Sequence, residues 1–368
     1  MIPYGRQNID HSDINAVVKT LKSDFLTQGP KVLEFEKALA KYCGARYAVA
    51  VSSGTAGLHL AYLAVGIKHG DEVLTTPNTF VATANMIIVT GAKPVFCDIR
   101  EDTYNIDEKK IEKLITKKTK AIVPVHFAGH PCEMTKIKKI AKKHKITVIE
   151  DACHALGAKY KNKKIGNIGG MAVFSFHPVK PITTGEGGAV VTNDKKLYEK
   201  LLSLRSHGIH KDKSGKNVMT ELGYNYRLTD IQSALGISQL KRLNSFIKRR
   251  RDIVRKYEKE LSSVKDIILP KELSNVYSGW HLYIIRVKNK RIRDKLMKYL
   301  KKNGIGVNFH YPAVYSHPYY RKNGFKSFSL SIEEKYHSTC ITLPLYPDLK
   351  KTEIRLITNI IKSFFSKI

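Results

Sequence analysis

The amino-acid sequence predicts an α/β protein with a mixed, mostly parallel sheet covered by helices and a smaller C-terminal α+β domain. Short apolar runs rich in β-branched residues alternate with helical patterns through the first two-thirds of the chain. These runs are apolar throughout, which is typical of strands buried on both faces. After about residue 240 the pattern changes to a long charged helix followed by a few further elements. We therefore predict two domains, residues 1–245 and 246–368.

The first predicted elements are two helices, a strand and a third helix. Ser12 can cap the first helix, whose apolar residues repeat at the i, i+3, i+4, i+7 spacing. The second helix is predicted to end at Gly44. Residues 47–53 (YAVAVSS) then predict a strand, and residues 54–66 (GTAGLHLAYLAVG) predict a helix.

Further strands are predicted in the runs EVLTTP, PVFCDI, AIVPVHF, ITVIED and AVFSF. Helical stretches such as VATANMIIVTG and EMTKIKKIAKKHK separate several of them. The runs AVFSF and GAVVTND are joined by a glycine-rich turn, so part of the sheet is expected to be antiparallel. FIKRRRDIVRKYEKELSS predicts a long charged helix that leaves the first domain, and HLYIIRV, GVNFHY and TEIRLITNIIKSFF indicate the smaller one.

Composition and charge narrow the class of protein. Of the 368 residues, 42% are hydrophobic and 26% charged, which supports a sizeable core and argues against a disordered chain. The net charge of +32 favours anionic partners such as nucleic acid, acidic lipid or phosphorylated small molecules. The basic residues are spread along the chain without zinc-finger spacing or an RNP-like motif, so we expect no nucleic-acid partner and no bound metal.

The sequence also indicates a compartment. No apolar run approaches the roughly 20 residues that a membrane span needs, so we expect no membrane partner. The first residues, MIPYGRQNIDHSD, lack an apolar signal-peptide core. Five cysteines, odd in number and widely spaced, indicate reduced thiols and no disulfide framework. We therefore predict a cytoplasmic location.

Two predicted strands end in groups that can bind a ligand, as the strand ends of open parallel α/β sheets commonly do. Gly54 and Thr55 open a helix after a strand, where free N–H groups and the helix dipole attract an anion; simple capping is the alternative. Asp151 ends the apolar run ITVIED, where a carboxylate is costly unless paired. It could hold a protonated ring nitrogen, a metal or an arginine, and His154 could reach the same ligand.

The strongest candidate is Lys180, in the segment AVFSFHPVKPITTGEGGAVVTND. It follows a predicted strand and stands between Pro178 and Pro181, and Pro181 biases it away from helical geometry. A lysine in a partly buried cleft can have a lowered pKa and form a Schiff base with an aldehyde. A surface lysine is the alternative, but few surface loops carry a lone lysine between prolines and glycines behind a core strand.

Two further segments carry polar residues with more than one interpretation. Asn225 stands just before an amphipathic helix and could serve a site, an interface or the helix start. His310 and Tyr311 end a strand-like run in the second domain and could line a cleft between domains; ordinary packing before Pro312 is the alternative.

One cofactor, pyridoxal 5'-phosphate (PLP), accounts for these pieces together. It needs a lysine for the Schiff base, an acidic partner for the ring nitrogen, a cradle for the phosphate and a flat apolar partner for the ring. The chain supplies one of each, in Lys180, Asp151, Gly54-Thr55 with Ser175, and Phe80.

The motifs LTQGPKVLEFEKALA, SSGTAGLHLA, TFVATANM, EDACHALGA, SFHPVKPITTGEGG and GYNYRLTDIQSALG resemble those of the DegT/DnrJ/EryC1/StrS sugar aminotransferases, which are fold type I PLP enzymes. The resemblance covers nearly the whole chain. Within the family, SFHPVKPITTGEGG with RSHGI and LTQGP is most similar to the UDP-4-amino-4,6-dideoxy-N-acetyl-β-L-altrosamine transaminases of pseudaminic acid biosynthesis.

The resemblance implies a role for each matching residue. Lys180 would form the Schiff base and move the proton, Asp151 would pair with the ring nitrogen, and His154 would lie near the ring. Phe80 would stack on the ring, and Gly54, Thr55 and Ser175 would hold the phosphate. Asn225 would reach the phosphate of a neighbouring subunit, which implies a homodimer with shared sites. The nucleotide-sugar pocket would be lined, partly across the dimer, by Tyr4, Asp24, Phe25, Leu26, Thr27, His310, Tyr311, Pro312 and Ala313.

The activity implied is transfer of an amino group from L-glutamate to C4 of a UDP-linked 4-keto-6-deoxy-N-acetylhexosamine, UDP-2-acetamido-2,6-dideoxy-β-L-arabino-hex-4-ulose. Some relatives replace the lysine with histidine and act as dehydratases, whereas this chain keeps Lys180. Two alternatives stay open. One is an aminotransferase for another nucleotide 4-keto sugar, of the perosamine or bacillosamine type, and the other is a non-catalytic regulator on the same fold.

Overall fold

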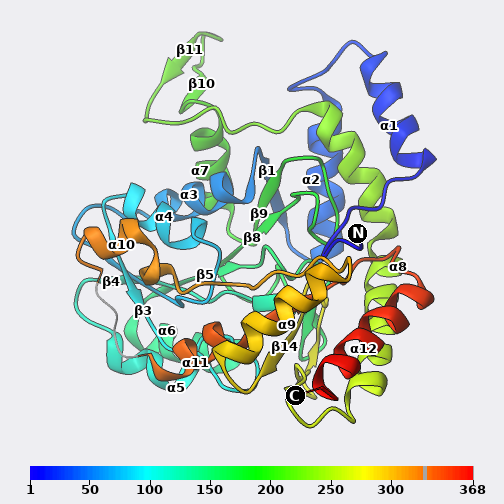
Figure 1. Cartoon of the computed structure of the whole chain (residues 1–368). Helices are drawn as coiled ribbons and strands as arrows, with labels where there is room; N and C mark the ends of the chain where they lie inside the picture. Colours follow the sequence, from blue (N-terminus) through cyan, green and yellow to red (C-terminus); the bar gives the residue numbers. More distant parts are fainter. Residues whose placement is uncertain (326–329, 368) are drawn as a thin grey trace.

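The computed structural model describes residues 1–325 and 330–367. Within them, seven strands form a central sheet in the order β1-β9-β8-β5-β4-β2-β3 (Figure 1). Strand β9 is antiparallel to both its neighbours, and the other adjacent pairs are parallel, as the sequence predicts. The strands are β1 (Tyr47–Val51), β2 (Glu72–Thr75), β3 (Lys93–Phe96), β4 (Thr119–Val123), β5 (Thr147–Asp151), β8 (Met171–Ser175) and β9 (Gly188–Thr192).

Helices cover both faces of this sheet. Successive side chains of a strand point to opposite faces, so Ala48 and Ala50 of β1 join one core cluster and Val49 and Val51 the other. The first cluster lies under α2 (Pro30–Cys43), α6 (Met134–His144) and the first half of α8 (Asp230–Leu261). The second lies under α3 (Gly54–Ala64), α4 (Ala82–Val89) and α7 (Lys195–Arg205).

Two expectations about the first helices have different outcomes. Helix α1 (His11–Leu21) is capped by Asp10 and not by Ser12, because the Asp10 carboxylate accepts the N–H groups of Ser12 and Asp13 in a capping box. Helix α2 ends at Gly44 as predicted, with Gly44 in the left-handed region at φ 73°.

Helix α8 joins the two parts of the chain. The predicted charged helix is the second half of a 32-residue helix, which starts at a capping box between Thr229 and Gln232. Its first half places Leu240 and Leu243 in the core of the large sheet, and its second half places Tyr257 in a separate C-terminal core. The predicted division between residues 245 and 246 falls inside α8, and it stays a prediction.

The C-terminal core surrounds a small antiparallel sheet. Strand β14 (Tyr283–Val287) pairs with β12 (Ile267–Ile268) and β15 (Cys340–Leu343), and α9 (Lys290–Lys302) and α12 (Lys351–Phe365) pack beside it. The strand-like run GVNFHY forms no strand. Its backbone bonds to two different partners, since Gly306 N–H donates to Ile2 O while Asn308 forms an isolated bridge with Thr342.

The remaining elements are short. A hairpin of β10 (Ile209–Lys211) and β11 (Asn217–Met219) extends from the molecule near α7 (Figure 1). Of the helices in the described part of the chain, none is both long and apolar enough to cross a membrane. The other short elements are α5 (Glu108–Ile111), α10 (Pro318–Lys322), α11 (Ser331–Thr339), η1 (Glu112–Leu114), η2 (Phe127–Gly129), η3 (Val314–Ser316), β6 (Lys159–Tyr160), β7 (Lys163–Lys164) and β13 (Val276–Tyr277).

Candidate active site

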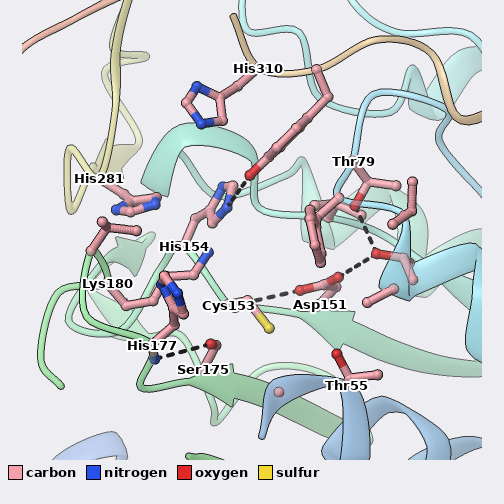
Figure 2. A pocket seen from close by; sticks show the side chains of 18 of the residues that line it. Thr55, Thr79, Asp151, Cys153, His154, Ser175, His177, Lys180, His281 and His310 are labelled. Carbon is pink, nitrogen blue, oxygen red and sulfur yellow. Dashed lines mark hydrogen bonds between the residues drawn. The ribbon is translucent and has the colours of Figure 1, made fainter. Parts of the chain in front are cut away.

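A cavity of about 700 Å³ opens at the carboxyl ends of β5 and β8, next to the start of α3 (Figure 2). It brings together residues that are widely separated in the sequence, from the N-terminal segment, the large sheet and the C-terminal part. Of the residues predicted for the site, it is lined by Tyr4, Gly54, Thr55, Phe80, Asp151, His154, Ser175, Lys180, His310, Tyr311 and Pro312.

The other predicted site residues lie outside this cavity. Asn225 is exposed and forms a backbone bridge with Ser206. Residues 24–27 (Asp24, Phe25, Leu26 and Thr27) are all exposed. Asn225 was expected to act across a dimer, and the nucleotide-sugar pocket partly so, and both expectations stay predictions. Ala313 is only 1% exposed and packs in a cluster with Phe96, so it does not line the cavity of its own chain.

Lys180 is held in the turn that follows β8. Its backbone N–H donates to His177 O at 2.9 Å, and Pro181 after it is buried. Burial lowers the pKa of Lys180, and the nearby Cys153 thiol and Asp151 carboxylate partly oppose that effect. A lysine with a lowered pKa has a larger neutral fraction, which is the form that attacks a carbonyl group. The side chain therefore suits the predicted covalent role.

Asp151 ends β5 as a buried carboxylate, 5% exposed. Its Oδ2 accepts the Thr83 hydroxyl at 2.7 Å, and its Oδ1 accepts the Cys153 N–H at 3.2 Å. Among the described residues it forms no ion pair. A buried carboxylate without a cationic partner is costly, so the cavity favours a ligand with a positively charged nitrogen near it.

The start of α3 offers donors for an anion. Ser53 caps the helix by accepting the Ala56 N–H, which leaves the N–H groups of Gly54 and Thr55 without a partner among the described residues. Ser175 lies beside them, since a Cβ on Gly54 would come within 2.9 Å of Ser175 Cβ. Two free N–H groups and a hydroxyl at a helix N-terminus match the needs of a phosphate group.

Three buried histidines form the wall above Lys180 (Figure 2). The His154 ring lies 4.5 Å from the His281 ring, and His154 Nε2 is 3.1 Å from the Tyr311 hydroxyl. Burial lowers the pKa of His154 and of His281 well below the usual value, and nearby positive charges add to the effect. Burial and then Lys180 lower the pKa of His310 to about 3. Neutral imidazoles are therefore expected around the lysine at physiological pH.

Sequence reasoning missed several residues of this cavity. Thr79 and Thr83 stand four apart in TFVATANM, a spacing that places both on one side of a helical turn, but nothing in it points to Asp151. His281 precedes a core strand, and only the tertiary fold shows that it faces the cavity. The other lining residues outside the predicted set are Ser53, Leu58, Val81, Ala82, Val125, Cys153, His177, Val179, Glu186, Asn308, Phe309 and His317.

Comparisons with known proteins agree with this geometry. The model of the DegT/DnrJ/EryC1/StrS aminotransferase family matches residues 7–362. A Campylobacter jejuni protein named UDP-4-amino-4,6-dideoxy-N-acetyl-beta-L-altrosamine transaminase is 43% identical over 373 residues, covering 100% of this chain and 98% of its own. Helicobacter pylori PseC, an aminotransferase involved in the biosynthesis of pseudoaminic acid, matches with a TM-score of 0.96 and 37% identity over 100% of both chains. Spr1654 of Streptococcus pneumoniae in its PLP form matches at 0.95 and 32%, over 100% of this chain and 99% of its own.

The fold and the cavity together define a PLP-dependent transaminase. More particularly, the chain belongs to the DegT/DnrJ/EryC1/StrS aminotransferase family, whose relatives include sugar aminotransferases. The predicted family, fold class, enzyme class and cofactor are confirmed. The residues of the cavity fit PLP, because they offer an amine with a lowered pKa, an unpaired buried carboxylate and free donors for a phosphate.

Proposed function

We propose that this enzyme transfers the amino group of L-glutamate to C4 of a UDP-linked 4-keto-6-deoxy-N-acetylhexosamine, as in pseudaminic acid biosynthesis. The observation that carries the proposal is the 43% identity, over the whole chain, with the Campylobacter jejuni transaminase named for the corresponding amino sugar. The cavity supports it, since Tyr4, Pro312 and His317 line it together with Lys180 and it is large enough for more than the cofactor.

We propose the following roles within the cavity. PLP, when bound, supplies an aldehyde that joins to amines and a ring that takes up electrons from the substrate carbon. Lys180 takes the proton from that carbon in one half-reaction and returns a proton in the other. Asp151 keeps the ring nitrogen protonated, and the neutral His154 lies near the ring. Phe80, 57% exposed at the cavity wall, covers a ring face, and the phosphate is held by Gly54, Thr55 and Ser175.

The test uses the visible absorption of the purified holoenzyme. L-Glutamate alone is expected to bleach the yellow colour of the bound cofactor and to release one equivalent of 2-oxoglutarate. A panel of UDP-linked 4-keto sugars is then expected to restore the colour, and NMR of the product identifies the amino sugar. Restoration by a keto sugar of the perosamine or bacillosamine type alone would replace the proposed acceptor. Bound cofactor that never exchanges its amino group would favour the regulator.

We also propose that two copies of the chain share their active sites. Apolar side chains are exposed both within residues 24–27 and near Asn225, as a buried interface requires. The exposed fractions are 52% for Phe25, 59% for Met219 and 70% for Leu222. The α1 helix and the β10–β11 hairpin project at the same end of the molecule (Figure 1). Asn225 and residues 24–27 then reach the cavity of the partner.

Shared sites predict that two inactive variants regain activity when their subunits are mixed. Lys180→Ala and Asn225→Ala each impair both sites of their own homodimer. In the hybrid, one site carries both substitutions and the other carries neither, so random mixing restores about a quarter of the wild-type activity. Transaminase activity is measured before and after subunit exchange in mild denaturant. Activity that never exceeds the sum of the two separate variants would show that each site is built from one chain.

A further inference from the structure

Two threonine hydroxyls link the segment that carries Phe80 to the carboxylate of Asp151. Thr83 Oγ1 donates to Asp151 Oδ2 at 2.7 Å, and Thr79 Oγ1 lies 2.7 Å from Thr83 Oγ1. Figure 2 shows both hydrogen bonds as dashed lines between Thr79 and Asp151. The exposed fractions of Thr79 and Thr83 are 2% and 0%, so water does not compete for these bonds.

Which hydroxyl donates to which follows from the number of hydrogens that each can donate. A threonine hydroxyl has one hydrogen to donate, and an ionised carboxylate only accepts. Because Thr83 gives its hydrogen to Asp151, Thr79 must donate to Thr83. Hydrogen bonds that point the same way along a chain polarise and strengthen one another. The hydroxyl chain therefore ends on the carboxylate and holds it more firmly than Thr83 alone would.

The carboxylate is held from two sides. Its other oxygen accepts the N–H of Cys153, in the turn directly after β5. Thr83 lies in the first turn of α4, and its backbone carbonyl accepts the Tyr62 hydroxyl at 3.1 Å. The same short segment, residues 79–83, thus lines the cavity with Phe80 and fixes the orientation of the carboxylate.

We propose that Thr79 and Thr83 are positioning residues that aim the Asp151 carboxylate at the ring nitrogen of PLP. This inference rests on the proposed role of Asp151. A carboxylate that can turn away from the ring nitrogen stabilises the proton on that nitrogen less well. Loss of the hydroxyl chain is therefore expected to weaken retention of the cofactor and to change the pH dependence of its visible absorption, and not only to slow turnover.

The test compares Thr83→Val with Thr83→Ser in the full-length holoenzyme. Valine matches the shape of threonine without the hydroxyl, whereas serine keeps the hydroxyl. Thr83→Val is expected to increase the rate of PLP loss on dilution about tenfold and to shift the pH midpoint of the visible band. Thr83→Ser should stay within about twofold of wild type, and Thr79→Val should fall between them, since it leaves the bond from Thr83 to Asp151 intact.

Two control variants complete the test. One distinguishes a positioning role from a packing effect, and the other tests the proposed role of Asp151. Tyr62→Phe removes a hydrogen bond to the same helix but leaves the hydroxyl chain, so it should keep the PLP retention and the pH midpoint of wild type. Asp151→Asn tests the proposed role of Asp151, so it should weaken PLP retention and shift the pH midpoint. If Asp151→Asn changes both readouts while Thr83→Val changes neither, the hydroxyl chain has no positioning role. Equal losses in Thr83→Val, Thr83→Ser and Tyr62→Phe would also overturn the proposal.

Discussion

Replacing Lys180 by alanine is expected to reduce multiple-turnover transamination by about 10³-fold or more, because the proton transfers at the substrate carbon lose their base and acid. The expectation is strong for a structural reason. Among the described residues that line the cavity, Lys180 is the only lysine or arginine, so no second amine is placed to take over. Steady-state assays with L-glutamate and a keto sugar measure the loss.

The control is Lys164→Ala, which removes a lysine that packs over the Tyr42 ring, away from the cavity. Activity should stay near wild type in that variant. Treatment with borohydride gives an independent readout, because it fixes PLP covalently to the lysine that holds it. Peptide mapping is expected to find the label on Lys180 in wild type and none in Lys180→Ala. Sustained turnover by Lys180→Ala, or a label on another lysine, would contradict the assignment.

Local sequence patterns were sufficient to predict the fold and the site where one segment determines both structure and chemistry. The uninterrupted apolar runs predict the buried strands, and the strand ends predict where Asp151 and Lys180 come together. The glycine-rich turn before GAVVTND predicts the antiparallel β9. In each case a short pattern is enough, because proline, glycine or burial disfavours the other local structures that the segment could form.

The sequence was insufficient to predict the structure where contacts between segments far apart in the chain determine it. GVNFHY alternates like a strand, but its Gly306 bonds to Ile2 and its Asn308 to Thr342, which no local pattern reveals. Ser12 is a good capping residue, yet Asp10 two positions earlier makes the stronger capping box. The contacts of Thr83 with Asp151 and of His281 with His154 join segments far apart in the sequence, so only the folded chain shows them. The cytoplasmic location stays a prediction.

Replacing Gly188 by alanine is expected to lower both the stability of the fold and the affinity for PLP. A Cβ on Gly188 would lie 2.5 Å from Ser53 C and 2.6 Å from Gly54 N, and these are backbone atoms that cannot rotate away. Gly188 is also fully enclosed at the start of β9, between β1 and β8, so the strand has little room to move. We expect the free energy of unfolding to fall by about 3 kcal/mol, the upper part of the range for overpacked cores.

The effect on the cofactor follows from which atoms must move. The displaced backbone carries the N–H groups of Gly54 and Thr55, which we propose hold the phosphate, so PLP is expected to bind at least about tenfold more weakly. Gly279→Ala is the matched control, because its Cβ would meet Leu156 O at 3.7 Å, an ordinary contact. Urea unfolding and PLP titration are measured for both variants. A wild-type urea midpoint in Gly188→Ala would show that α3 can shift without cost, and unchanged PLP binding at reduced stability would place the phosphate elsewhere.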